Sequence, residues 1–135
     1  MENLDKMAKI LVIDDEQLHR DHAAKILRDA GYEVLVAEGG EQGLRRIAES
    51  MPDLVLCDAV MPEVDGFAVL ERLRADPKSR AVPFAIFTAM RVKGVRSEAK
   101  QQGAQDFLNK PYKAEEQLAM VQRLLGEVDS AGPAR

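Results

Sequence analysis

Three acidic side chains are the residues of this sequence best placed for chemistry. Asp14 and Asp15 directly follow the apolar run Ile10–Ile13. Asp58 directly follows a second apolar run, Leu54–Cys57. If the fold brings these carboxylates together they repel one another, and a divalent cation with oxygen ligands, such as Mg²⁺, would supply the positive charge they need. Because Mg²⁺ commonly completes its coordination with a phosphate, the three acids indicate phosphate chemistry.

Two further polar residues occur at the ends of apolar runs. Thr88 closes the run Phe84–Thr88, and Lys110 follows the run Gln105–Leu108. A hydroxyl and an ammonium are both suited to hold the oxygens of a phosphoryl group. Taken singly, an Asp after a strand is commonly a helix cap, a Thr is an ordinary strand residue and a Lys is a surface charge. Five such residues at the ends of four runs are better explained as one site.

The elements that must position this site alternate along the chain. Short apolar runs predict strands that are buried on both faces, and apolar residues three or four apart predict helices between them. The predicted strands are Ile10–Ile13, Glu33–Ala37, Leu54–Cys57, Phe84–Thr88 and Gln105–Leu108, and the predicted helices are Leu18–Ala30, Leu44–Met51, Phe67–Leu73, Val92–Ala99 and Ala114–Leu125. This alternation predicts an α/β fold, a doubly wound five-stranded parallel sheet of order 2-1-3-4-5, with ligands bound beyond the carboxyl ends of the strands.

Length and composition limit the classes of function. The 135 residues predict one domain, and the net charge of -4 gives no electrostatic reason for direct binding to nucleic acid or an anionic membrane. A single cysteine, Cys57, excludes an internal disulfide bond. The first residues lack the apolar core of a secretory signal, so we expect a cytoplasmic protein. We expect the domain to span residues 8–126, with residues 127–135 as a flexible tail or the start of a linker.

An ordered set of motifs resembles the receiver domain of bacterial response regulators, the CheY-like domain of two-component signalling. The motifs are Ile13-Asp14-Asp15-Glu16, the segment Asp53–Pro62, Asp65-Gly66, Phe87-Thr88-Ala89, Gly103-Ala104 and the segment Phe107–Pro111. The resemblance covers residues 9–125, nearly the whole chain. It implies a flavodoxin-like or CheY-like fold and a phosphorylation-dependent signalling switch.

The resemblance implies that Asp58 accepts a phosphoryl group from the phosphohistidine of a sensor histidine kinase or phosphotransfer protein. Asp15, Asp58 and the backbone carbonyl of Val60 would bind Mg²⁺ directly, and Asp14 would bind it through water. Such a chain is not an enzyme with a separate substrate, because it catalyses only its own phosphorylation and dephosphorylation. An effector domain outside this chain or a downstream protein would receive the signal.

The resemblance also assigns the groups that hold the phosphoryl oxygens. Lys110 would pair first with Asp58 and then with a phosphoryl oxygen. The hydroxyl of Thr88 and the backbone N–H groups of Val60 and Ala89 would hold the other oxygens. In the family a cis peptide bond often precedes the proline that follows the lysine, here Pro111.

A change of shape must follow the new charge. The resemblance implies that Thr88 shifts toward the phosphoryl group and that Phe107 turns inward. The face made by the fourth helix, fifth strand and fifth helix would then change, and Lys93, Arg96 and Lys100 place a basic stripe on it. We therefore expect this face to bind a partner or form a homodimer, although a charged stripe is more commonly plain solvated surface.

Two other classes of protein share parts of this pattern. A haloacid-dehalogenase-type phosphatase or transferase also uses an Asp nucleophile, Mg²⁺ and a Lys, but it usually carries a second acid two residues after the nucleophile, where this chain has Val60. A flavodoxin-like cofactor carrier would need a Ser/Thr/Gly phosphate loop after the first strand. We interpret His19 and His22 as exposed helix residues, because no further metal-ligating residue accompanies them. Cys57 should face away from the site as a buried apolar residue.

Overall fold

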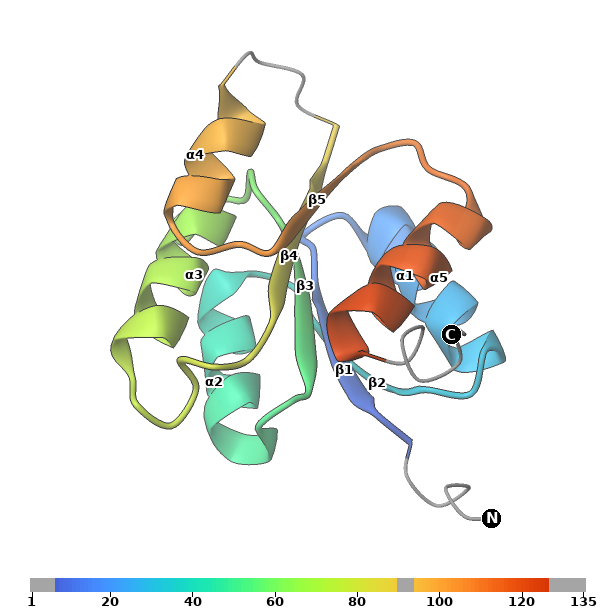
Figure 1. Cartoon of the computed structure of the whole chain (residues 1–135), viewed down its shortest axis with the longest axis horizontal. Helices are drawn as coiled ribbons and strands as arrows, with labels where there is room; N and C mark the ends of the chain where they lie inside the picture. The colour runs from blue at the N-terminus through green and yellow to red at the C-terminus, as the bar shows by residue number, and fades with distance from the viewer. Residues whose placement is uncertain (1–6, 90–93, 127–135) are drawn as a thin grey trace.

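The computed structural model describes residues 7–89 and 94–126 of the chain, in which five strands alternate with five helices (Figure 1). The strands are β1 (Lys9–Ile13), β2 (Glu33–Ala37), β3 (Leu54–Asp58), β4 (Phe84–Thr88) and β5 (Asp106–Asn109). The helices are α1 (Gln17–Asp29), α2 (Gly40–Ser50), α3 (Gly66–Ala75), α4 (Val95–Gln101) and α5 (Ala114–Leu125). The predicted alternation is confirmed.

The strands form one parallel sheet with the order β2-β1-β3-β4-β5. The register pairs Ile13 with Ala37 on one side and with Cys57 on the other, and it pairs Thr88 with Asn109. Because all strands run in the same direction, their carboxyl ends lie along one edge of the sheet. The predicted doubly wound, CheY-like fold class is confirmed.

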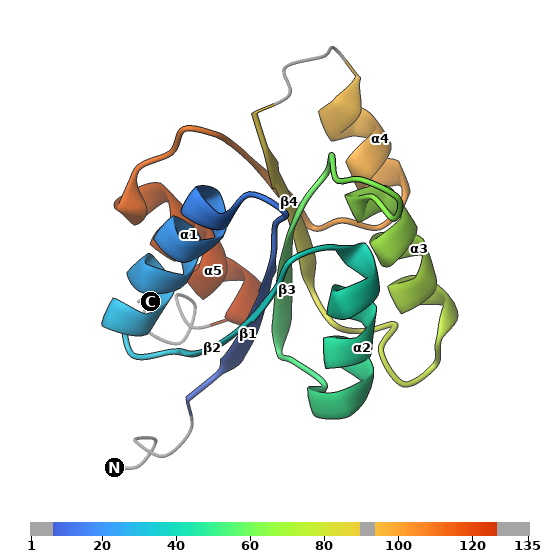
Figure 2. The same ribbon diagram turned by 180° about the vertical axis from the view of Figure 1, so that it is seen from behind.

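Two layers of helices cover the sheet. Helices α1 and α5 pack on one face, and α2, α3 and α4 pack on the other (Figures 1 and 2). Every residue of β3 and β4 is buried, which explains why those runs are apolar without interruption. The core is correspondingly divided in two. Fully buried members of the layer under α2 to α4 include Leu11, Ile13, Val55, Phe84 and Ile86, and those of the layer under α1 and α5 include Ile10, Val12, Leu27, Leu54 and Leu56.

The junction between β3 and α3 holds the end of β3 in place. The side chain of Asp65 caps α3 by accepting a hydrogen bond from Ala68 N at 2.9 Å. The next residue, Gly66, donates its N–H to Ala59 O at 3.0 Å. A Cβ atom at Gly66 would lie 2.3 Å from the carbonyl oxygen of Asp58, so only glycine allows this close approach.

Some boundaries differ from the sequence predictions. Strand β5 begins at Asp106, one residue later than predicted, and the side-chain oxygen of Gln105 accepts a hydrogen bond from Phe84 N at 2.8 Å. Helix α4 begins at Val95 after Gly94, which adopts a left-handed φ of 94°. The predicted helical positions Val92 and Lys93, and the predicted tail at residues 127–135, lie outside the described residues.

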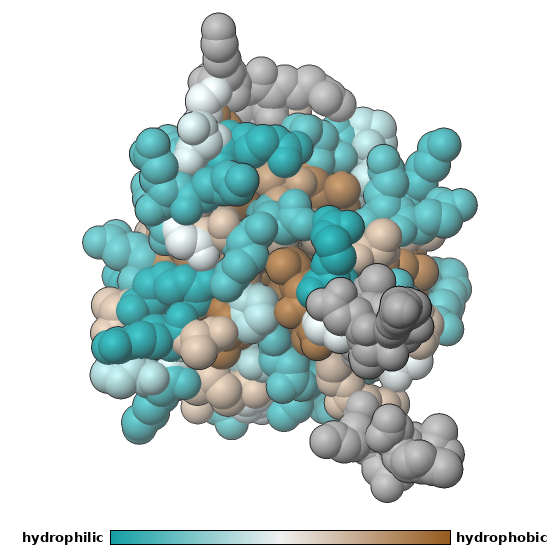
Figure 3. Space-filling view, in the orientation of Figure 1, coloured by the Kyte–Doolittle hydropathy of each residue, from teal (hydrophilic) through white to brown (hydrophobic). Residues whose placement is uncertain are grey.

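The surface in the orientation of Figure 1 is mainly hydrophilic, and apolar side chains show chiefly near the centre of the view (Figure 3). Large apolar side chains that are exposed include Leu18 and Val60. Within the described ranges, the helices are all too short or too polar to cross a membrane.

Candidate functional site

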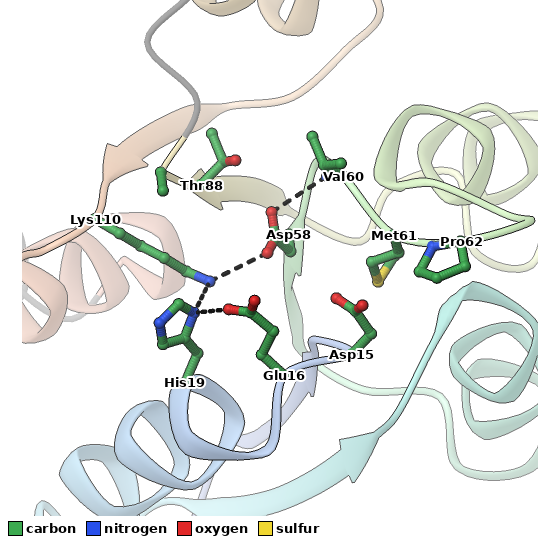
Figure 4. Close-up of a pocket in the computed structure, with 10 residues that line it drawn as sticks. Asp15, Glu16, His19, Asp58, Val60, Met61, Pro62, Thr88 and Lys110 are labelled. Carbon is green, nitrogen blue, oxygen red and sulfur yellow. Dashed lines mark hydrogen bonds and ion pairs between the residues drawn. The ribbon is translucent and has the colours of Figure 1, made fainter.

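A cleft of about 460 Å³ opens at the carboxyl ends of the strands (Figure 4). It is lined by Asp15, Glu16, His19, Asp58, Val60, Met61, Pro62, Thr88, Ala89 and Lys110. These residues come from the ends of β1, β3, β4 and β5, from the loop between β3 and α3, and from the start of α1. The edge predicted to carry the site is therefore the edge where the cleft lies.

Three carboxylates meet at the cleft because β1 and β3 are neighbours in the sheet. One oxygen from each of Asp14, Asp15 and Asp58 lies within 4.8 Å of the others. Asp14 is fully buried, Asp58 is almost fully buried and Asp15 is exposed. The group thus has two anchored acids and one that faces solvent.

Asp14 accepts hydrogen bonds at both its side chain and its backbone carbonyl. Its Oδ1 accepts a hydrogen bond from Glu16 N at 2.9 Å, and its carbonyl oxygen accepts one from Arg20 Nη1 at 3.0 Å. Burial raises the pKa of the Asp14 carboxyl above its ordinary value, and the hydrogen bond from Lys110 acts in the opposite direction. A cation in the cleft would favour the ionised carboxylate.

Lys110 supplies the positive charge of the cleft. Its Nζ donates to Asp14 Oδ2 at 2.7 Å and to Asp58 Oδ2 at 3.1 Å, and the side chain is almost fully buried. The backbone N–H of Lys110 donates to Thr88 O at 2.9 Å, which ties the lysine to the end of β4. The peptide bond between Lys110 and Pro111 is cis, as the resemblance implied.

The remaining predicted residues surround Asp58. Thr88 is buried at the end of β4 and lines the cleft beside Ala89. The backbone N–H of Val60 donates to Asp58 Oδ1 at 3.2 Å, while Val60 as a whole residue is 51% exposed and lines the cleft. The structure therefore brings all of the predicted site residues together.

Four residues that line the cleft were not predicted as site residues: Glu16, His19, Met61 and Pro62. His19 is not simply exposed: its Nδ1 lies 2.8 Å from Lys110 Nζ and 2.7 Å from Glu16 Oε1 (Figure 4). For Glu16 and His19, their place in the sequence could have indicated this, because the first turn of a helix that directly follows Asp14 and Asp15 lies beside the site. His22, one turn further along α1, is exposed as expected, and its ring lies 5.7 Å from that of Tyr112.

Two other expectations concern residues near the site. Cys57 is fully buried and is a member of the core layer under α2 to α4, so it does not belong to the cleft. Burial raises the pKa of its thiol well above the ordinary value, and the charge of Asp58 adds to the effect. Phe107 is already buried in this structure, with the Arg96 guanidinium 4.8 Å from the centre of its ring.

The donor set fits a hard divalent cation. Three carboxylates within 4.8 Å of one another offer oxygen ligands, and the exposed side of Asp15 leaves room for waters. A softer metal would favour thiolate or several imidazoles, and the neighbouring thiol of Cys57 is outside the cleft. The cluster could therefore hold Mg²⁺ or a similar ion.

An acidic cleft that faces a buried lysine, at the carboxyl edge of a 2-1-3-4-5 parallel sheet, defines the CheY-like class of signalling domains. The chain belongs to the response regulator receiver domain family, whose model matches residues 10–122. This is a family of signalling domains rather than of classical enzymes. The haloacid-dehalogenase alternative finds no support in this match.

Curated relatives agree with this assignment. The chain is 34% identical over 119 residues to the protein PilH of Pseudomonas aeruginosa, covering 88% of this chain and 98% of PilH. It is 37% identical over 123 residues to the DNA-binding dual master transcriptional regulator RpaA of Synechocystis, covering 91% of this chain and 51% of RpaA. The chain thus spans about half the length of RpaA, and it spans 23% of the response regulator PleD of Caulobacter vibrioides.

Solved structures show the same fold. The chemotaxis protein CheY4 of Vibrio cholerae superposes with a TM-score of 0.84 at 32% identity, covering 89% of this chain and all of CheY4. The receiver domain of the sensor histidine kinase PA1611 of Pseudomonas aeruginosa superposes with a TM-score of 0.82 at 30% identity, covering 90% of this chain and 99% of that domain. The PA1611 structure has a magnesium ion coordinated in its active site cleft.

Proposed function

We propose that this chain is a switch in which Asp58 accepts a phosphoryl group from a phosphohistidine and the new charge alters a binding face. The position of the Asp58 carboxylate carries the proposal. One oxygen accepts from Val60 N and the other accepts from Lys110 Nζ, at the floor of an open cleft. The carboxylate is thereby oriented toward the space where a donor would enter.

The proposed transfer is a displacement at phosphorus. An Asp58 oxygen forms a bond to phosphorus, the bond from phosphorus to the imidazole nitrogen of the donor breaks, and its electron pair stays on that nitrogen. Such transfers depend on positioning and on neutralising charge. Lys110 would move from Asp58 to a phosphoryl oxygen, while the Thr88 hydroxyl and the N–H groups of Val60 and Ala89 would donate to the others.

We also propose the ligands of the metal ion. Asp15, Asp58 and the carbonyl oxygen of Val60 would bind Mg²⁺ directly, and the buried Asp14 would bind it through water. The ion would supply positive charge to the phosphoryl oxygens. The magnesium ion in the PA1611 receiver domain, together with the three carboxylates here, supports this proposal.

Acetyl phosphate with Mg²⁺ tests the acceptor. Intact mass should rise by one phosphoryl group in the parent and should not change in Asp58→Asn. Asp53→Asn is the matched control, because Asp53 lies just before the same strand and accepts from Lys9 N, far from the cleft. Equal incorporation into Asp58→Asn and the parent would refute the assignment of Asp58.

The partners follow from the same proposal. A sensor histidine kinase or phosphotransfer protein would supply the phosphoryl group. An effector domain outside this chain or a separate protein would receive the signal, as the longer relatives RpaA and PleD suggest. We further propose residues 8–126 as the domain that performs the switch, in the cytoplasm.

The face of α4, β5 and α5 is the proposed output surface. Arg96 and Lys100 are exposed on α4, and Arg123 of α5 donates to Asp106 of β5 at 2.6 Å. Lys93, the third residue of the expected basic stripe, lies outside the described residues. Light scattering on the protein with and without phosphorylation would test whether phosphorylation produces a homodimer.

A further inference from the structure

His19 lies in the cleft, yet no step of the proposed phosphoryl transfer uses it. Its Nδ1 is 2.8 Å from Lys110 Nζ and 2.7 Å from Glu16 Oε1. The side chain comes from the first turn of α1 and is 44% exposed. Water therefore reaches the ring, while the Nδ1 atom faces the lysine that must bind the phosphoryl group.

The two contacts of Nδ1 are alternatives. An ammonium only donates, so the bond from Lys110 requires an unprotonated Nδ1 and a ring proton on Nε2. A carboxylate only accepts, so a bond to Glu16 requires the proton on Nδ1. One ring nitrogen cannot satisfy both partners at once, and the geometry thus contains two states of His19.

Lys110 must exchange a partner when a phosphoryl group arrives. An ammonium has three N–H groups, and Asp14, Asp58 and His19 place three acceptors within 3.1 Å of Nζ. Hydrogen bonds to carboxylates are charge-assisted on both sides and are stronger than a bond to a neutral imidazole. His19 is therefore the acceptor that Lys110 gives up first, when the phosphoryl group arrives, and Lys110 leaves Asp58 only as Asp58 forms its bond to phosphorus.

We infer that His19 is a positioning residue that holds one N–H of Lys110 before phosphorylation and releases it to the incoming phosphoryl oxygen. The released ring then takes a proton on Nδ1 from water, returns its Nε2 proton to water and donates to Glu16. This inference rests on the proposed function. Because the bond exists only before transfer, His19 stabilises the unphosphorylated state and slows phosphorylation.

A metal ion bound by Asp14, Glu16 and His19 is the alternative explanation for the position of His19. The ligand atoms of these three residues also lie within 4.8 Å of one another. The ammonium of Lys110 already occupies that position, in contact with both Asp14 and His19. A cation there would have to displace the lysine on which the phosphoryl transfer depends. The exchange of hydrogen-bond partners by Lys110 explains the same contacts without displacing the lysine.

The ring protonation can be measured directly. We would record ¹⁵N shifts of the histidine rings at about pH 8.5, two units above the ordinary histidine pKa, and assign them with His19→Asn. The proton of His19 should be on Nε2 in the unphosphorylated protein. It should appear on Nδ1 after addition of Mg²⁺ and beryllium fluoride, which mimics a phosphoryl group. A proton on Nδ1 at the start, or no change when the Thr88 and Ala89 amides show that the mimic has bound, would overturn the inference.

Kinetics with acetyl phosphate provide the second test. His19→Leu should take up phosphate about three- to tenfold faster than the parent, which is the effect of one hydrogen bond partly replaced by water. His19→Asn should restore the parent rate, because its side-chain oxygen occupies nearly the position of Nδ1. His22→Leu is the control, since His22 is exposed one turn away and its ring lies beside that of Tyr112.

The outcomes of this second test separate the two proposals. A His19→Leu rate equal to or below that of the parent would overturn the role of His19 and leave the acceptor assignment intact. A parent that takes up no phosphate would refute the proposed function instead. Even if the parent takes up no phosphate, the position of the ring proton before addition of the mimic shows whether His19 accepts a hydrogen bond from Lys110.

Discussion

Val60 combines two roles at one position, because its backbone N–H orients Asp58 while its side chain stands at the mouth of the cleft. Hydrolysis of an aspartyl phosphate needs a water molecule in line with the breaking bond, and an isopropyl group cannot orient that water. We expect Val60→Asn to speed loss of phosphate about tenfold, equivalent to roughly 1 to 2 kcal/mol from one hydrogen bond to the attacking water.

Release of phosphate after removal of acetyl phosphate would measure this rate. Val60→Leu, whose side chain is close in size to that of asparagine but forms no hydrogen bond, serves as a comparison of bulk. The same lifetime in Val60→Asn and the parent would show that this side chain does not control access of water. Met90, two residues after Thr88, lies outside the described residues.

Cys57 lies next to Asp58 in the sequence and carries a thiol, a reactive group. We nevertheless expect this thiol to be unreactive in the folded protein. Burial raises the pKa of its thiol, and the thiolate is the reactive form. We expect the folded protein to resist iodoacetamide at pH 8 and the protein in urea to react completely, as mass spectrometry would show. Rapid modification of the folded protein would mean that β3 opens far more readily than its complete burial indicates.

Single site residues could be predicted where they lie at the carboxyl end of a strand. Asp58, Thr88 and Lys110 follow strands whose order the alternation predicts, so their meeting could be expected. His19 could not be found in this way, because it lies on a helix and its partner Lys110 is distant in sequence. A helical pattern tells which face is apolar, but it does not tell which polar residue of the first turn reaches into the cleft.

At the scale of elements, the start of α3 packs directly against the backbone at the end of β3. A methyl group at Gly66 would overlap the Asp58 carbonyl oxygen, which belongs to backbone and cannot move aside cheaply. We expect Gly66→Ala to destabilise the protein by about 1 to 3 kcal/mol, the range for overpacking, and to slow phosphorylation by displacing Asp58.

Urea denaturation would measure this loss. Gly39→Ala is the comparison, because a Cβ there meets no atom within 4 Å and only the preference of a helix cap is lost, about 1 kcal/mol or less. Equal losses in the two variants would show that the junction between β3 and α3 adapts to the added atom.

Element type was easier to predict than element ends. The runs in β3 and β4 are apolar throughout because both faces are covered, and that signal is unambiguous. The start of β5 is set by Gln105, whose side chain bonds Phe84 N and Arg74 Nη2. Such tertiary contacts override local preference, and a pattern of apolar residues does not report them.

At the scale of the whole molecule, titration of buried groups couples stability to pH. Burial raises the pKa of the Tyr112 phenol far above its ordinary value of 10.0, with a smaller contribution from the charge of Asp14. The folded protein keeps a proton that the unfolded chain loses above pH 10. The contribution of Tyr112 to stability is therefore complete below pH 10 and is lost as the pH rises through and above that value.

Urea unfolding at pH 9 and pH 11 tests this dependence. The parent should lose more stability than Tyr112→Phe over this interval, by up to about 1.4 kcal/mol per pH unit. Identical losses would mean that the phenol titrates alike in the folded and unfolded chains. The ring contact with Phe87, at 6.2 Å between centroids, is kept in the variant, so the comparison isolates the hydroxyl.

The amino ends of the strands carry a different kind of network from the cleft. The guanidinium of Arg74 donates to the carbonyl oxygens of Gly103, Arg80 and Val82, at distances of 2.6 to 3.3 Å, and so fastens the segments that lead into β4 and β5. Lys9 does the same for β1 through Ser50 and Asp53. The residues that do chemistry therefore lie at the carboxyl ends of the strands, and the hydrogen bonds of Arg74 and Lys9, which hold the strands in place, lie at the amino ends. Substitutions of side chains that line the cleft, such as Val60→Asn, should therefore change the chemistry of the site and leave the hydrogen bonds of Arg74 and Lys9 in place.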